Sequence, residues 1–293
     1  RIRPGETEHR VGLARLQAAG GDLTKAEATL RQAIQAKPDD DNRYLLLADF
    51  LASRKSVIEA EKFLSAAIES RPKAYALQFS LARLDAGSGN VDQAERIYRG
   101  IVERDRLGPD GLRARSDLAD LRLRRGRPDE AAALIAEVLK QNPHDNQALM
   151  LRGQLALDLG NAIGAIADFR SVFKDQPNSV PVMTQLARAH LANGERELAR
   201  ETMGKAVILY PKQPEVRVLM AELKAATADL PGAIEDLEVV LSQDPKNFRA
   251  LNIKADIRVA QRNWKAAEES LAMLRKSYPQ DAGVYKRLGG LYF

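Results

Sequence analysis

The chain has 293 residues, of which 45% are hydrophobic, 29% are charged and 5% are aromatic, and its formal net charge is +5. So mild a charge differs from the dense positive surface of a dedicated nucleic-acid-binding protein, and no apolar run comes near the roughly 18 residues that a membrane-spanning helix needs. The sequence contains no cysteine, which excludes disulfides, thiolate zinc sites and a cysteine nucleophile.

A fixed spacing of alanine and proline runs through the chain. Alanines follow one another at intervals of 34 residues, with one interval of 37, and a proline stands twelve residues after each of them except Ala94, where Arg106 takes its place. A period of this length kept along the chain is the signature of a repeat protein. The alanines are Ala26, Ala60, Ala94, Ala131, Ala165, Ala199, Ala233 and Ala267, and the prolines are Pro38, Pro72, Pro143, Pro177, Pro211, Pro245 and Pro279.

Each unit of this period is predicted to contain a first helix and a second helix. In the unit of residues 146–179, apolar residues recur at helical spacing in 146–160 and again in 162–174, with Gly160 between them as a helix-terminating glycine. Proline then ends the second helix. Because short connections make successive helices antiparallel, the sequence predicts an all-α solenoid of stacked helix pairs.

In chain order, a single superhelix over 1–293 is expected to contain eight full repeats and a partial ninth. The repeats occupy residues 7–40, 41–74, 75–108, 112–145, 146–179, 180–213, 214–247, 248–281 and, for the partial repeat, 282–293. The partial repeat is either a capping helix or the start of a further repeat, and the apolar Phe293 at its end favours the second interpretation.

The one break in the period is the segment 106–111, which reads RLGPDG and carries three extra residues. Gly108, Pro109 and Gly111 indicate a loop here rather than a lengthened helix. The segment is therefore interpreted either as a tolerated surface insertion or as a break in superhelical pitch that divides the array into two halves.

Small residues are predicted to mark the helix crossings. A third row of the repeat contains only alanine and glycine, and it lies on the first helices: Ala14, Ala48, Ala82, Ala119, Gly153, Ala187, Ala221, Ala255 and Gly289. Facing the alanine row of the second helices, these residues let two backbones approach closely, so a leucine at Ala165 is expected to overpack the crossing.

A 34-residue helix-turn-helix unit, with small residues at two crossings and a terminal proline, resembles the tetratricopeptide repeat. The segment YKRLGGLYF, Tyr285 to Phe293, is the best single match to the first-helix signature of that family, and the resemblance covers residues 6–293. It implies a right-handed superhelix with the first helices on its concave side. It implies little about biochemistry, because this repeat supports many functions.

The resemblance places first-helix residues in a partner-binding groove that is apolar with charges of both signs between the apolar rows. The apolar row is Val11, Leu45, Phe79, Ser116, Met150, Thr184, Val218 and Asn252, and the charged row is Arg15, Asp49, Arg83, Asp120, Gln154, Arg188, Glu222 and Asp256. A second apolar row either faces the groove or is buried between adjacent first helices: Ala18, Ala52, Ala86, Leu123, Leu157, Leu191, Ala225 and Val259. Aspartate at both Phe79 and Met150 is expected to abolish partner binding without unfolding.

The segment of residues 113–127 is rich in arginine and is a candidate anion patch for carboxylates, phosphates or an acidic polysaccharide. The alternative is an ordinary solvated helix face. No aromatic residue lies between the arginines, so stacking on single-stranded nucleic acid is not expected. The arginines are Arg113, Arg115, Arg122, Arg124, Arg125 and Arg127.

No residue pattern indicates catalysis, a metal site or a cofactor. His9, His144 and His190 are far apart in sequence, and none of them forms an i, i+4 pair with a second ligand. His190 is expected to be partly buried in the core, and His144 is expected to be solvated in a turn.

The sequence therefore predicts a non-enzymatic scaffold that binds an extended or helical segment of a protein or peptide partner in its groove. In chaperone-binding members of the resembled family a two-carboxylate clamp occupies places that hold Val11, Leu45 and Phe79 here, so that clamp is absent, and the asparagine ladder of members fused to a sugar transferase is absent too. The alternative hypothesis is a targeting or regulatory arm of an enzyme whose catalytic domain lies outside these residues. Self-association through the terminal repeats is a further option, whereas a nucleic-acid partner is not expected.

Long alanine- and arginine-rich repeats without cysteine are similar to large bacterial repeat proteins of the cell envelope, some of which accompany exopolysaccharide export. This likeness implies a location in the periplasm or envelope, with the cytoplasm as the alternative.

Overall fold

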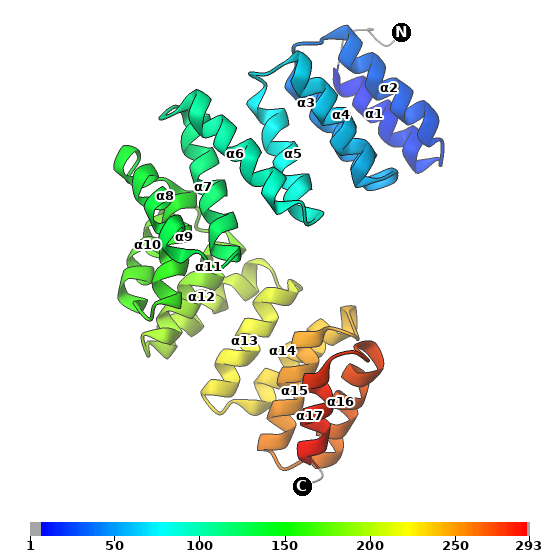
Figure 1. The fold of residues 1–293 in the computed structure, drawn as a ribbon. Helices are drawn as coiled ribbons and strands as arrows, with labels where there is room; N and C mark the ends of the chain where they lie inside the picture. Colours follow the sequence, from blue (N-terminus) through cyan, green and yellow to red (C-terminus); the bar gives the residue numbers. More distant parts are fainter. Residues whose placement is uncertain (1–6, 292–293) are drawn as a thin grey trace. The chain divides into compact units, whose positions relative to one another are not determined.

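The computed structural model describes residues 7–291, and within that range the chain is helical with short turns and no strand (Figure 1). The helices are α1 (Thr7–Ala19), α2 (Leu23–Ala36), α3 (Asp41–Arg54), α4 (Val57–Ser70), α5 (Tyr75–Gly87), α6 (Val91–Asp105), α7 (Pro109–Arg124), α8 (Pro128–Gln141), α9 (Asn146–Asp158), α10 (Ala162–Asp175), α11 (Val180–Ala192), α12 (Arg196–Leu209), α13 (Pro214–Ala226), α14 (Leu230–Gln243), α15 (Phe248–Ala260), α16 (Trp264–Ser277) and α17 (Ala282–Leu291). No helix in this range is both long and apolar enough to cross a membrane.

Each of the eight predicted full repeats corresponds to one helix pair, which confirms the all-α solenoid. Odd-numbered helices are the first helices and even-numbered ones the second helices of the repeats, and the two helices of a repeat pack against each other. Asx residues begin several second helices: Asp22, Asn161, Asp229 and Asn263 each accept a hydrogen bond from the backbone N–H three residues on, at 2.9–3.2 Å. Such caps satisfy a donor that the first turn leaves unpaired.

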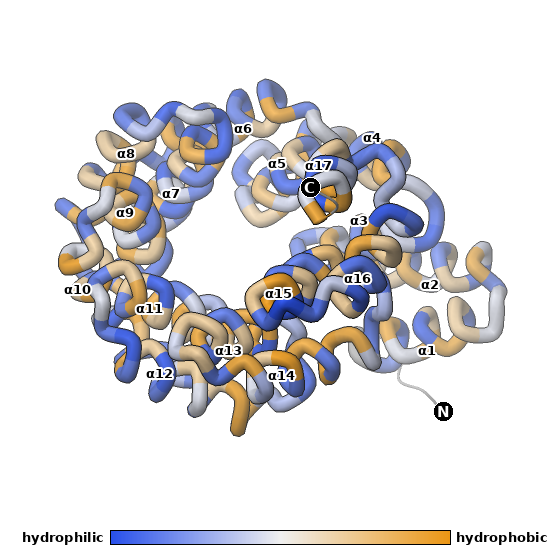
Figure 2. The backbone as a smooth tube through the Cα atoms, turned by 90° about the horizontal axis from the view of Figure 1, so that it is seen from below, coloured by the Kyte–Doolittle hydropathy of each residue, from blue (hydrophilic) through white to orange (hydrophobic). Residues whose placement is uncertain are grey.

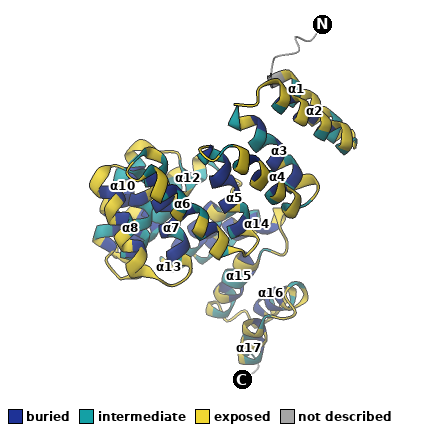
Figure 3. Ribbon diagram, turned by 45° about the horizontal axis from the view of Figure 1, so that its top comes forward, coloured by how far each residue is buried: buried dark blue, intermediate teal, exposed yellow. Residues whose placement is uncertain are grey.

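The predicted crossings are the core of each pair. All eight alanines of the second-helix row have no exposed surface, from Ala26 to Ala267. The first-helix row is buried as well, except for Gly289, which is half-buried. Figure 3 shows the buried residues on the inner sides of the helix pairs and the exposed ones on their outer sides.

Glycines end five first helices in the left-handed conformation, as the sequence predicts. Gly21, Gly89, Gly126, Gly160 and Gly194 have φ between 68° and 90°. Two later repeats make the same turn without glycine, since Ala228 and Arg262 occupy this position at φ 64° and 57°.

The prediction of a loop at 106–111 is wrong in one respect, because the extra residues lengthen a helix. The helix α7 begins at Pro109, with Gly108 as its extended N-cap. Proline is well suited to the first position of a helix, where its missing N–H costs no hydrogen bond. Gly111 fits inside the added turn because a side chain there would lie 2.2 Å from the carbonyl oxygen of Arg106.

The chain divides into two compact units, one up to Pro143 and one from His144. The insertion lies inside the first unit, where α6 and α7 pack against each other. A single superhelix over 1–293, with a change of pitch at 106–111, remains a prediction.

The partial ninth repeat is represented by α17, which packs against α16 and buries Val284 and Leu288. Residues 1–6, Tyr292 and Phe293 lie outside the described residues, so the interpretation of Phe293 as an uncapped end is not addressed.

Candidate partner-binding groove

The first helices of each unit lie side by side and form one face, which we call the first-helix face. Contacts join α3 to α5 in the first unit and α9, α11, α13 and α15 in succession in the second unit. In Figure 2, α9, α11 and α13 follow one another on one side of the layer and α10, α12 and α14 on the other. These contacts make the face continuous from α9 to α15 in the second unit and from α3 to α5 in the first unit.

Neighbouring first helices cover part of the predicted groove. Every member of the second apolar row is half-buried, from Ala18 to Val259. This agrees with burial between adjacent first helices rather than with full exposure, because each of these side chains keeps only part of its surface free.

Three residues of the first apolar row are buried, so the expectation that they face an open groove is wrong. Phe79, Ser116 and Val218 are between 1% and 3% exposed. Phe79 packs with Tyr98 and is covered by Arg113, whose guanidinium carbon lies 4.1 Å from the centre of the Phe79 ring. Aspartate at Phe79 would thus place a charge in the core and is no longer expected to leave the fold intact. The other five members are half-buried: Val11, Leu45, Met150, Thr184 and Asn252.

A cavity of about 370 Å³ opens on the first-helix face between α1 and α3. Its walls are mainly apolar, and its rim carries charges of both signs, Arg15 and Asp49. The lining includes three residues of the rows predicted from the sequence, Val11, Ala14 and Ala18. It adds several that were not predicted to face the groove: Ala19, Leu30, Leu46, Phe50, Ser53 and Arg54. Leu46 and Phe50 are four residues apart and therefore lie on the same side of α3. This spacing is the sequence signal that could have identified them as lining residues.

The two rim charges of this cavity are unpaired. Arg15 and Asp49 are exposed, and neither makes a hydrogen bond or ion pair with any described residue. Arg83, in the same row, is exposed and likewise unpaired within residues 7–291, whereas Asp120 pairs with Arg124 at 2.9 Å. The first unit therefore keeps free charges beside an apolar hollow.

Most residues of the charged row in the second unit make hydrogen bonds or ion pairs with other residues of the protein. Glu222 accepts hydrogen bonds from Arg249 at 2.7–2.9 Å, and Asp256 pairs with Arg287. Gln154 donates to Asp158 at 3.0 Å. Asn252 also accepts a bond from Arg287. The contacts of Arg249 and Arg287 join successive first helices, whereas the bond from Gln154 to Asp158 lies within α9. Arg188 is the exception in this row.

The candidate anion patch is held in intramolecular pairs. Arg115 donates to Glu137 at 2.7 Å, and Arg122, 2% exposed, pairs with Glu95 and with Glu130. The other pairs are Arg124 with Asp120, Arg125 with Asp92 at 2.5 Å and Arg127 with Glu130 at 3.8 Å, while Arg113 covers Phe79. The sequence did not predict these partners, because most of them lie on other helices, α6 and α8, than the arginines. An anion-binding role for the patch remains a prediction, and these pairs weigh against it.

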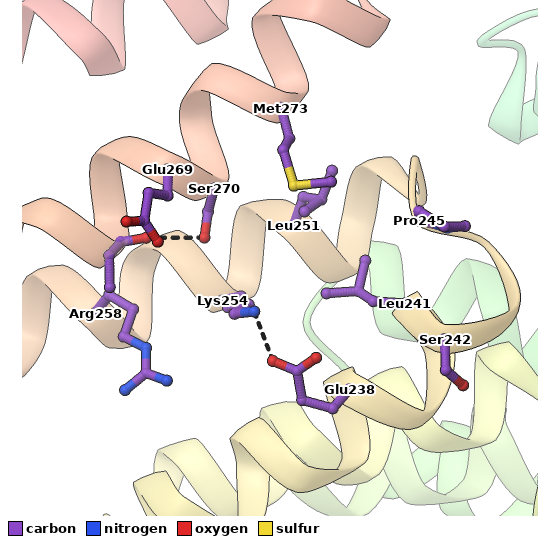
Figure 4. Close-up of a pocket in the computed structure, with 11 residues that line it drawn as sticks. Glu238, Leu241, Ser242, Pro245, Leu251, Lys254, Arg258, Glu269, Ser270 and Met273 are labelled. Carbon is purple, nitrogen blue, oxygen red and sulfur yellow. Dashed lines mark hydrogen bonds and ion pairs between the residues drawn. The ribbon is translucent and has the colours of Figure 1, made fainter.

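A second cavity of about 370 Å³ lies in the second unit, between α14, α15 and α16 (Figure 4). Lys254 and Glu238 form an ion pair of 2.6 Å across it, and Met273 and Leu251 supply apolar walls. The cavity lies outside the predicted groove.

The histidines make no catalytic arrangement in the described part of the chain. His190 is buried, as expected, and its Nδ1 lies 2.5 Å from Oε2 of Glu195. His9 and His144 are exposed. No group of three potential metal ligands gathers within residues 7–291.

Two proteins of known structure share this fold. The APC/C hetero-tetramer Cut9–Hcn1 has a TM-score of 0.71 at 12% identity, covering 97% of this chain and 55% of that one. The type IV pilus biogenesis factor PilW has a TM-score of 0.66 at 18% identity, covering 74% of this chain and 99% of that one. At these identities the likeness concerns the fold alone.

Sequence comparison also relates the chain to curated proteins. Cellulose synthase operon protein C of Xanthomonas axonopodis pv. citri is 26% identical over 254 residues, which make up 81% of this chain and 17% of that protein. The chain spans a fifth or less of the two curated cellulose synthase operon proteins that it matches.

Two family models, both described as tetratricopeptide repeat, match most of the chain. One matches residues 11–76, 79–137 and 116–180, and the other matches residues 156–223 and 225–289. Together with the helix pairs and the buried small residues at their crossings, these matches show that the chain belongs to the tetratricopeptide repeat family.

Proposed function

We propose that this chain is a non-enzymatic scaffold that binds a segment of a protein partner on its first-helix face. The observation that supports this most is the cavity between α1 and α3, which combines apolar walls with the unpaired charges Arg15 and Asp49. Apolar side chains of a partner would fill the hollow, and the two charges would fix its direction.

The partner system is proposed from the curated relatives. Cellulose synthase operon protein C of Xanthomonas axonopodis pv. citri is named for an exopolysaccharide system, so we place this scaffold in the assembly of such a bacterial envelope system. The alternative function, an arm of a larger enzyme, is supported by one observation: the match covers only 17% of that relative.

The scaffold is tested by closing the cavity. Ala19 lines it and is exposed, so Ala19→Trp fills the space from the rim without changing the core. Ala28 is an exposed alanine on the neighbouring helix α2 that lines none of the cavities described above, which makes Ala28→Trp the matched control.

Wild type and both variants are used as baits in a native lysate, with quantitative mass spectrometry of the captured proteins. We expect the captured amount of a defined set of proteins to fall at least about tenfold with Ala19→Trp, which is the loss expected when an apolar anchor is removed. The captured amount should stay constant with Ala28→Trp. Equal capture by all three baits would remove the cavity from the binding surface.

A further inference from the structure

A third cavity, of about 430 Å³, lies in the first unit between α4, α5 and α6, and none of its lining residues belongs to the predicted groove. Among the described residues its lining contains three carboxylates and one cationic side chain: Glu61, Glu69, Asp85 and Lys62. Lys62 and Glu69 are exposed, and neither makes an ion pair with a described residue. The cavity therefore carries negative charge that its own lining does not neutralise.

Asp85, in the last turn of α5, is the most buried of these carboxylates, with 5% of its surface exposed. Its Oδ2 has no hydrogen-bond partner among residues 7–291. Burial, followed by the charge of Glu61, raises the pKa of the Asp85 carboxyl, and the charge of Arg96 and a hydrogen bond with Asn90 offset this only in part. An ionised carboxylate withdrawn from water with so little compensation is costly, so a further cation would be favourable at this position.

Glu61 of α4 lies near Asp85 and has one unused oxygen. Its Oε1 accepts a hydrogen bond from the Ser88 hydroxyl at 3.0 Å, whereas its Oε2 has no partner among the described residues. Glu61 is only half-buried, so a ligand in the cavity can reach this oxygen. Arg96 of α6 acts on Asp85 through its charge but donates its hydrogen bonds to Gln93, at 2.5 and 3.1 Å. The two carboxylates thus lack a cation that bonds to them.

Apolar surface lines the same cavity. Ile58 of α4 is 62% exposed, and Ala66 and Leu81 also belong to the lining. An arginine side chain combines an apolar stem with a planar head of five N–H donors, so its stem can cover apolar surface while its head bonds to carboxylates. A lysine ammonium is a compact point charge and cannot present such a planar set of donors.

We propose that this cavity binds an arginine side chain of a protein partner, with the guanidinium donating to Glu61 and lying against the charge of Asp85. Charge complementarity selects this occupant, because the lining offers carboxylates without partners and a planar guanidinium can serve two of them at once. The inference rests on the proposed function in taking the chain to be a scaffold for a protein, and it adds a binding position outside the first-helix face.

The second unit has a cavity in the equivalent place, and the charge at its key position is reversed. Arg258, which lines the cavity of Figure 4, occupies the place in its repeat that Asp85 occupies in the third repeat. In that cavity Glu238 is already paired with Lys254. An arginine side chain is therefore expected at Asp85 and not at Arg258.

The test uses the full chain and two small probes at constant ionic strength, N-acetyl-arginine amide and its neutral near-isostere N-acetyl-citrulline amide. Binding is followed by NMR of the backbone amides. The variants are Glu61→Gln and Asp85→Asn. Glu103→Gln is the matched control, because Glu103 is an exposed carboxylate of α6 that lines none of the three cavities. The melting temperature of each variant is measured alongside.

We expect the arginine probe, and not the citrulline probe, to shift amide signals of α4 and α5 around the cavity. Glu61→Gln and Asp85→Asn should each lower the affinity for the arginine probe about tenfold, the scale of a lost charge-assisted hydrogen bond. Glu103→Gln should leave this affinity unchanged.

Two further readouts distinguish a binding role of Asp85 from a structural one. The affinity for the arginine probe should rise between about pH 4 and pH 8, because a protonated Asp85 has no charge to attract a guanidinium, and the rise should be smaller in Asp85→Asn. The melting temperature of Asp85→Asn at neutral pH should stay level or rise, because asparagine avoids the cost of burying an ionised carboxylate.

Equal shifts from the two probes, or a loss with Glu103→Gln as large as with the other two variants, would overturn the proposal. A clear drop in the melting temperature of both Glu61→Gln and Asp85→Asn would also overturn it, since it would mark the two carboxylates as structural. Ala19→Trp separates this inference from the proposed function. Capture that falls with Ala19→Trp, without an Asp85-dependent response to the arginine probe, would contradict this inference alone, and the reverse pair of results would contradict only the cavity between α1 and α3.

Discussion

At the helix crossing of the fifth repeat, a glycine on the first helix leaves room for an aromatic ring on the second helix. In the second and eighth repeats, alanines at Ala48 and Ala255 share a core cluster with leucines at Leu64 and Leu271. The fifth repeat has glycine and phenylalanine instead, and a Cβ atom added to Gly153 would lie 2.5 Å from the Phe169 ring. The larger ring is accommodated because the opposing side chain is missing.

Gly153→Ala should therefore destabilise the protein although alanine favours a helix. The helix preference gains about 1 kcal/mol, whereas overpacking against a fully buried ring costs about 1–3 kcal/mol. In the Phe169→Leu background the same change should be stabilising, because it restores the alanine–leucine pair of other repeats. Urea unfolding of the two single variants and the double variant measures this coupling, and additive effects would show that the two residues do not compete for space.

Tyr98 gives the first unit a stability that depends on alkaline pH. Burial, with a smaller effect of Asp117, raises the pKa of Tyr98 above its ordinary value of 10.0. Its contribution is fully present below pH 10 and is lost as the pH rises above that value, because the unfolded chain then ionises while the folded one resists. No described residue makes a hydrogen bond to the Tyr98 hydroxyl.

We expect Tyr98→Phe to be about as stable as wild type at pH 8 and to lose less stability between pH 9 and pH 11. Chemical denaturation at several pH values compares the two proteins. If both lose stability in parallel over this range, the ionisation of Tyr98 does not contribute.

At the scale of the element, the turn between the two helices of a repeat requires a left-handed residue. Glycine takes this conformation without strain, whereas an L-residue pays about 1–2 kcal/mol, partly offset by its smaller loss of backbone entropy on folding. Ala228 adopts it at φ 64° after α13. The seventh repeat thus carries a strain that the glycine-containing repeats avoid.

Ala228→Gly should stabilise the protein by about 0.5–1 kcal/mol. Ala226→Gly is the matched control, because the same substitution two residues earlier, in the last turn of α13, should cost about 1 kcal/mol. Thermal unfolding of the two variants should give shifts of opposite sign. Two shifts of the same sign would show that backbone conformation does not decide the effect.

The turns between repeats are also tied to one another by a recurring donor. The hydroxyl of Tyr210 donates to the carbonyl of Asn178 at 2.6 Å, and that of Tyr278 donates to the carbonyl of Lys246 at 2.9 Å. In the first unit the guanidinium of Arg71 donates to the carbonyl of Asp39 at 3.0 Å in the same register. Each bond joins the ends of two successive second helices, which fixes the stacking of the repeats.

Elements and crossings could be predicted from the sequence because both depend on local spacing. Glycine at the turn, proline at the end and small residues between them placed the helices within a few residues of their bounds. The start of α7 was missed because Pro109 and Gly111 are read as loop residues, although the former also begins helices well and the latter avoids a clash with Arg106.

The surface was harder to predict, because it depends on neighbours that are distant in sequence. The burial of Phe79 requires Arg113 from another helix, and the pairing of Arg122 requires Glu95 from α6. The cavity beside Arg15 and Asp49 depends on how far apart α1 and α3 lie. Periodicity identifies which face a residue occupies, but it does not reveal what covers that face.

At the scale of the whole molecule, each repeat contacts chiefly its neighbours along the chain. Within each of the two units, the helix packing follows the order of the sequence, with contacts between consecutive helices and, for α3 with α5 and from α9 to α15, between successive first helices. Stability in such an array is a sum of repeat and nearest-neighbour terms, and no single core extends over all repeats. A local perturbation should therefore have local effects.

Ala165→Leu tests this. Ala165 has no exposed surface and packs with Phe169 and Leu186, so leucine should overpack the crossing of α9 and α10 and cost about 1–3 kcal/mol. Hydrogen exchange should show lost protection in α9 to α11 and unchanged protection in α1 to α4 and in α15 to α16. Ala167→Leu, on the exposed side of the same helix, should change neither exchange nor melting temperature. Loss of protection spread evenly over all helices would mean that the repeats unfold as one unit, and the nearest-neighbour description would then be wrong.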